Sequence, residues 1–199
     1  MKTNLNEADR YLLEHWEQSL EFEQGMNDVR TKYDQVFQAV IDELKEKEWW
    51  KEGAFRSYAS QLYGCIGFGK KVWLSTDHKW EWPSLWLDDL DLEYILVDTE
   101  TTPCVYVWLG GSKNQGPSPE VFKEKLLKAA APQIGKLPPR LQKYESGKTI
   151  LCWPLSGEKA ALKQMLLKGE TEALIEALVN ELDRLAPFIQ PIDSVLGVG

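Results

Sequence analysis

Two glycine-containing stretches of the sequence partly resemble loops that bind phosphate groups. Gly147, Lys148 and Thr149 match the end of a P-loop, but that motif needs a glycine five residues earlier, where Gln142 stands. A helix must also follow the threonine, whereas the next residues are typical of a strand. The glycines in residues 64–69 are wrongly spaced for a dinucleotide-binding loop. Neither stretch therefore predicts a nucleotide site.

Catalytic acids and bases are few. An enzyme could be built on His78, which follows an aspartate in a predicted turn, and on Asp98 and Glu100 at the end of a predicted strand. The two histidines are far apart and no two cysteines are closely spaced, so no zinc-binding pattern is present. We therefore expect no metal and no cofactor. The sequence favours a non-catalytic protein, with an enzyme that lacks a local motif as the alternative.

Tryptophans offer binding chemistry instead, because nine occur in this chain. Trp80, Trp82 and Trp86 have even spacing, so they would share one face of an extended chain. Asp88 and Asp89 follow them, and acids beside exposed rings favour a cationic group over the ring faces. We interpret these five residues as a candidate partner-binding or ligand-binding surface. Packing inside the protein is the alternative for the rings.

Four other tryptophans are expected to be core residues, because each would bury a large apolar area. They are Trp16, Trp73, Trp108 and Trp153.

The charges are unevenly distributed along a chain whose net charge is −8. Residues 113–168 carry 11 basic and 4 acidic side chains, against the acidic balance elsewhere. Lys136, Arg140, Lys143 and Lys148 in this region are possible nucleic-acid or phosphate contacts, which would give salt-sensitive binding. The sequence thus predicts a protein partner first, with nucleic acid as an alternative.

The elements that must position these residues predict an α+β fold. We expect a mainly antiparallel sheet of about five or six strands, with N-terminal and C-terminal helices packed on it. Residues 1–199 form a single domain: a helical region over 1–48, a sheet region with one inserted helix over 54–153, and helices with a tail over 156–199. The inserted helix, over 119–131, could serve as a crossover that gives one parallel strand pair.

The N-terminal region shows helical periodicity. Asn6 with Asp9 three residues later predicts a helix start. One apolar stripe ends at Leu20, a second begins at Met26, and the two point about a quarter turn apart. We expect a break or kink near Gly25, and whether residues 7–48 form one kinked helix or two stays open.

Strand patterns follow. Residues 62–68 and 71–74 resemble a hairpin, and residues 94–97 with 104–109 resemble the central strands because they are almost continuously apolar. Pro83 cannot donate to a sheet, so residues around it are expected in an edge strand or a loop.

Cysteine use and hydropathy indicate a cytoplasmic protein. Cys65, Cys104 and Cys152 each stand in an apolar strand-like run, so we expect buried thiols in a reducing compartment. The polar start predicts no export signal, and no apolar run approaches the ~20 residues that span a bilayer. We therefore expect a soluble protein without a membrane partner.

Overall fold

The structure is a computed structural model of the chain. It describes residues 6–60, 64–73, 84–88, 90, 95, 104–108, 119–134, 149–154 and 159–198.

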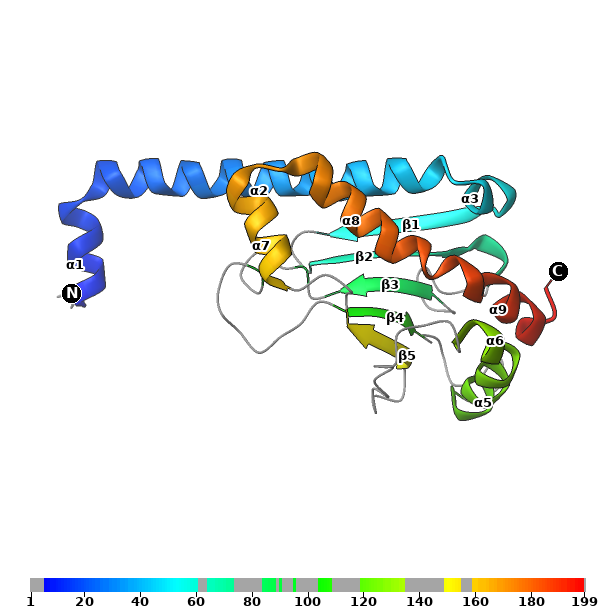
Figure 1. Cartoon of the computed structure of the whole chain (residues 1–199). Coiled ribbons are helices and arrows are strands. Elements are labelled where there is room, and N and C mark those ends of the chain that lie inside the picture. Colours follow the sequence, from blue (N-terminus) through cyan, green and yellow to red (C-terminus); the bar gives the residue numbers. More distant parts are fainter. Residues whose placement is uncertain are drawn as a thin grey trace.

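Five strands pair antiparallel in chain order to form the sheet (Figure 1). They are β1 (Phe55–Ser60), β2 (Cys65–Lys70), β3 (Ser84–Asp88), β4 (Cys104–Trp108) and β5 (Thr149–Pro154).

Apolar cross-strand pairs fix the register of the central strands. Ile66 of β2 lies opposite Leu87 of β3, and Leu87 lies opposite Val105 of β4. Leu85 is likewise placed between Phe68 and Val107. All of these side chains are buried, so a shift of one residue would turn them away from the core.

Most of the other described residues form helices. They are α1 (Glu7–Glu14), α2 (Trp16–Lys45), α3 (Glu48–Glu52), η1 (Lys71–Trp73), α5 (Pro119–Ala129), α6 (Ala131–Ile134), α7 (Lys159–Lys168), α8 (Thr171–Asp183), η2 (Ala186–Phe188) and α9 (Ile189–Leu196).

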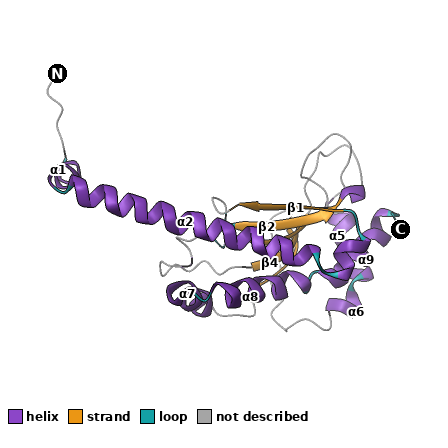
Figure 2. Cartoon of the chain, turned by 90° about the horizontal axis from the view of Figure 1, so that it is seen from above, coloured by secondary structure: helices purple, strands orange, loops and turns teal. Residues whose placement is uncertain are grey.

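The core lies where the C-terminal half of α2 and α8 run side by side across the sheet (Figures 1 and 2). From α2 it takes Tyr33, Phe37 and Leu44, and from α8 it takes Leu178 and Leu182. The Tyr33 hydroxyl donates a 2.7 Å hydrogen bond to the Leu90 carbonyl oxygen, so the buried phenol is satisfied. This bond joins α2 to the chain just after β3.

The N-terminal half of α2 extends beyond the sheet and carries α1 at its end (Figures 1 and 2). We call α1 together with residues 16–32 the arm. None of its side chains is buried. Its start is the one predicted: the Asn6 side chain accepts from the Asp9 N–H, and the Asp9 carboxylate accepts from the Asn6 N–H.

The predicted fold class is corrected by this architecture. The expectation was an α+β fold with a mainly antiparallel sheet of about five or six strands and with N-terminal and C-terminal helices packed on it. The described part of the molecule is instead mostly helical: α2 alone has 30 residues, whereas none of the described strands has more than 6. The arm, moreover, is not packed on the sheet.

The predicted break at Gly25 is also wrong. Helix α2 runs through Gly25 without interruption, and the chain bends instead at His15, whose φ of −117° and ψ of 35° are not helical. A glycine inside a helix costs only about 1 kcal/mol relative to alanine, which the surrounding helix formers offset.

The predicted hairpins were misplaced. Gly69 and Lys70 were expected to form a turn, but both belong to β2, where Gly69 lies opposite Arg56. The chain turns only afterwards, in η1, where the Lys71 N–H donates to the Ala54 carbonyl oxygen. The expected strand over 94–97 is contradicted at Ile95, the one residue described there, because it is helical.

Two further strand predictions fail. The segment after Pro83 was expected at an edge or in a loop, yet β3 is the middle strand, hydrogen bonded to β2 and β4. It begins at Ser84, one residue past the proline, so the ladder does not need the missing N–H. The suggested parallel pair is absent from the described sheet, because β5 runs antiparallel to β4.

Replacing Gly25 with alanine should stabilise the arm. A methyl group there meets no atom within 4 Å, so the substitution adds helix propensity without a clash. We expect the local opening free energy of the helix to rise by about 0.5–1 kcal/mol. The measurement is amide hydrogen exchange over residues 20–30, which should slow.

Gly169→Ala is the matched control. Its surroundings are equally open, but its φ is +69°, a conformation that side chains disfavour. Gly169→Ala should therefore destabilise the protein. Faster amide exchange over residues 20–30 in Gly25→Ala would contradict the finding that α2 is unbroken at Gly25.

Candidate interaction surface

Large apolar side chains are exposed mainly on the arm. The described part of the chain has eleven such side chains, and eight belong to the arm: Tyr11, Leu12, Leu13, Trp16, Leu20, Phe22, Met26 and Val29. Phe22 is 71% exposed and Val29 is 51% exposed. Single exposed apolar residues are ordinary, but a contiguous group marks an interaction site.

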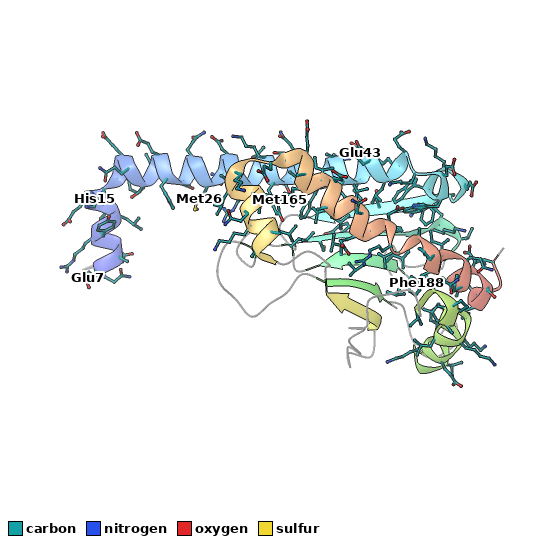
Figure 3. The ribbon with its side chains drawn as sticks, viewed as in Figure 1. Glu7, His15, Met26, Glu43, Met165 and Phe188 are labelled. Carbon is teal, nitrogen blue, oxygen red and sulfur yellow. The ribbon has the colours of Figure 1, made fainter. Side chains whose placement is uncertain are left out.

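Three of these residues continue a row that is buried further along α2. Phe22, Met26 and Val29 are followed by Tyr33 and Val36 at alternating spacings of four and three, which places them on one face of a helix. Figure 3 shows Met26 on the side of α2 that faces the sheet layer. The row is therefore one apolar seam, covered by the protein's own core from Tyr33 onward and uncovered over residues 22–29.

Charged residues surround the seam. The arm contains seven acids (Glu7, Asp9, Glu14, Glu17, Glu21, Glu23 and Asp28) and three bases (Arg10, Arg30 and Lys32). Glu23 and Arg30 are two turns apart on the same edge of the seam, because each lies one position beyond a seam residue. An apolar strip with charged margins is typical of a helix that pairs with another helix.

The sequence-predicted surface falls largely outside the described residues. Trp80, Trp82 and Asp89 lie outside them, and for Trp86 and Asp88 only the backbone in β3 is described. The basic residues Lys136, Arg140, Lys143 and Lys148 also lie outside, as do the acid–base candidates His78, Asp98 and Glu100. All of these assignments stay predictions.

Two of the tryptophans that were predicted to be core residues, Trp73 and Trp16, differ in their exposure. Trp73 is buried, as predicted, with 2% of its surface exposed. Trp16 is 56% exposed on the arm, so its assignment to the core was wrong. The two apolar stripes near Leu20 and Met26 indicated the apolar surface of the arm. They were interpreted as helix faces that would pack against other parts of the same chain.

Two tryptophan–aspartate contacts hold the C-terminal helices to the rest of the protein. Asp193 of α9 accepts hydrogen bonds from the Trp73 indole Nε1 and the Lys70 Nζ, both at 2.6 Å. Asp183 of α8 accepts from the Trp49 Nε1 at 2.6 Å. Each carboxylate satisfies an indole N–H beside the aromatic cluster of Trp49, Trp50, Phe55 and Phe68, so their role is structural.

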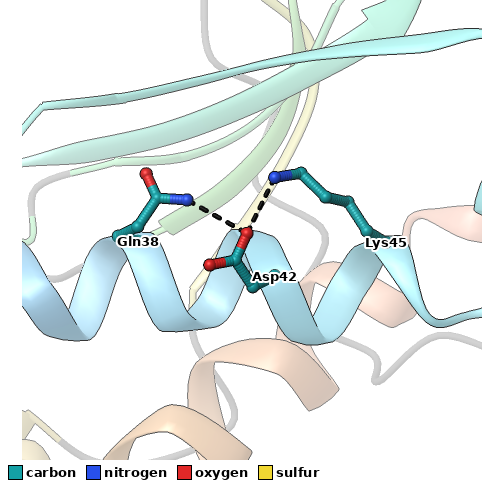
Figure 4. A network of polar contacts seen from close by, with 3 residues as sticks. All are labelled: Gln38, Asp42 and Lys45. Carbon is teal, nitrogen blue, oxygen red and sulfur yellow. Dashed lines mark hydrogen bonds and ion pairs between the residues drawn. The ribbon is translucent and has the colours of Figure 1, made fainter.

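A third carboxylate network is fully exposed on α2 (Figure 4). Asp42 accepts hydrogen bonds from Lys45 at 2.7 Å and from Gln38 at 3.1 Å. The hydrogen bond from Lys45, and then that from Gln38, lower the pKa of the Asp42 carboxyl from its ordinary value. Water screens such an exposed pair, so it adds little to stability.

Catalytic chemistry is not visible in the described residues. A depression of about 400 Å³ between α2 and α8 is lined by Glu43, Lys47, Glu172 and Glu176, and no histidine, cysteine, serine or threonine is among its lining residues. Within the described ranges, no group of three or more His, Cys, Asp and Glu side chains could hold a metal ion. No described helix is both long and apolar enough to cross a membrane.

Comparisons of the chain with protein-family models, curated proteins and solved structures found no match.

Removing the Asp193 carboxylate should loosen the C-terminal helix. In Asp193→Ala the buried Trp73 N–H loses its acceptor, and an unsatisfied buried donor costs about 1–3 kcal/mol. Urea unfolding followed by tryptophan fluorescence should show a loss of this size.

Asp42→Ala is the control, since it also removes a carboxylate with two donors but from an exposed position. Its unfolding curve should overlay that of the wild type. Equal losses in the two variants would show that the Asp193 contact has no special structural role.

Proposed function

We propose that the chain is a non-catalytic protein-interaction protein that binds through its arm. The observation that carries this proposal is the uncovered half of the α2 seam, because the same apolar row is buried where the chain supplies its own partner helix and is open where it does not. Phe22, Met26 and Val29 are the central contacts of the surface. A helical arm offered to another protein is the function that this geometry supports best.

The free energy gained by burying the exposed apolar side chains of the arm is large enough for specific binding. Fully burying a large apolar side chain contributes about 1.5–3 kcal/mol, and the arm offers eight such side chains that are exposed. Ordering costs remove part of this gain, so we expect a few central residues to dominate the affinity. The acidic flanks of the arm would then select among partners by charge.

The tryptophan surface formed by Trp80, Trp82, Trp86, Asp88 and Asp89 remains a second proposed contact area. It rests on spacing in the sequence alone. We also propose a cytoplasmic location, which rests on the apolar strand-like runs that contain Cys65, Cys104 and Cys152 in the sequence; the Cys65 side chain is buried in β2.

The proposal is tested by placing a photo-crosslinking phenylalanine analogue at Val29 in the full-length chain and irradiating living cells. Because Val29 lies in the uncovered seam, we expect a discrete protein adduct. The control carries the analogue at Val72, which is 62% exposed but lies on η1, away from the arm. It should yield no adduct. Absence of an adduct at Val29, or the same adducts from both positions, would refute the arm as the interaction surface.

A further inference from the structure

We infer that the arm binds the arm of a second copy of this chain, with the two helices running in opposite directions. This inference rests on the proposed function and names the occupant of the same surface. It follows from the length of the uncovered seam, from the position of Met26 and from the charges on the seam's edge.

The uncovered seam is short. From Phe22 to Val29 it spans seven residue steps, or roughly 10 Å at 1.5 Å per residue. Beyond it the seam enters the protein's own core at Tyr33, which is buried. A partner helix therefore crosses the arm at this place, as helices do when they pack ridge into groove, and does not run along the whole of α2.

A second arm supplies the surface that such a crossing needs. If the two-fold axis passes beside residues 26 and 27, Met26 of each copy contacts the region of Met26 and Val29 of the other. The patch is then self-complementary, as a two-fold interface requires. Methionine is flexible and polarisable, so two such side chains can fill the space between crossing helices.

The charged residues on the edge of the seam favour the antiparallel direction of the two helices. With the helices antiparallel, Glu23 of each copy lies beside Arg30 of the other. Both residues are on the same edge of the seam and are equally far from the two-fold axis between residues 26 and 27. Two opposite-charge contacts result. A parallel pair would instead place the edge that carries Glu23 and Arg30 against the opposite edge of the other copy's seam, so these two opposite-charge contacts would not form.

The bend at His15 is compatible with this arrangement. Helix α1 turns from the end of α2 toward the side on which the sheet lies (Figures 1 and 3). Tyr11, Leu12 and Leu13 of α1 are also exposed. A second arm that crosses on that side at Met26 would also meet α1, which would add apolar contacts.

Charge reversal at the two edge residues tests the pairing on the purified full-length chain by sedimentation equilibrium. The wild type should be a dimer. Glu23→Arg and Arg30→Glu alone should each weaken dimerisation by about tenfold or more, since each places like charges together twice. An equimolar mixture of the two variants should regain wild-type affinity as a heterodimer, because both contacts are again between opposite charges. Loss of helicity does not explain such a rescue.

The results separate this inference from the proposed function. A dimer insensitive to both charge variants, or unrestored by mixing them, would refute the antiparallel pairing. A monomeric wild type whose Val29 crosslinks to a different protein would refute the second copy while leaving the arm as an interaction surface. A monomer without any crosslink would refute both. An adduct of twice the chain mass together with the charge rescue supports the inference.

Discussion

Burial of the α2 seam is the interaction on which the rest of the structure depends. From Tyr33 to Leu44 the seam packs against α8 and β1, and it belongs to the same core cluster as the apolar row of the central strands, so one helix face contributes to both layers of the protein. Large apolar side chains gain most from such burial, and their packing also fixes the register of β2, β3 and β4. Elements that do not contact this core, the arm above all, have to find their contacts elsewhere.

Polar groups at the edge of the core are satisfied in a consistent way. The indoles of Trp49 and Trp73 each donate to an aspartate from a C-terminal helix, and the Tyr33 hydroxyl donates to a backbone carbonyl. These bonds connect segments more than 50 residues apart in the sequence. Because an unsatisfied buried donor is costly, they restrict where α8 and α9 can sit.

The arm is a helix because it continues one. A short isolated helix is marginal in water since nucleation is unfavourable, but residues 16–32 extend a helix that is already held by packing from Tyr33 onward. Extension adds one hydrogen bond per residue and tolerates Gly25. The protein can thus present apolar side chains away from its core at little conformational cost. That arrangement makes a helical surface available to a partner without unfolding the body.

Local chemistry was readable in the sequence, whereas long-range pairing was not. The capping box of Asn6 and the helical periodicity of residues 26–44 depend on neighbours within a turn or two, so both could be predicted. The partner of each strand and the exposure of Trp16 depend on which distant segments meet. The sequence shows that the α2 seam is apolar. Only the tertiary structure decides that α8 covers the half from Tyr33 onward and leaves residues 22–29 open. The physical reason is that α8 is short and lies far from α2 in the sequence, so no local pattern could place it against the seam.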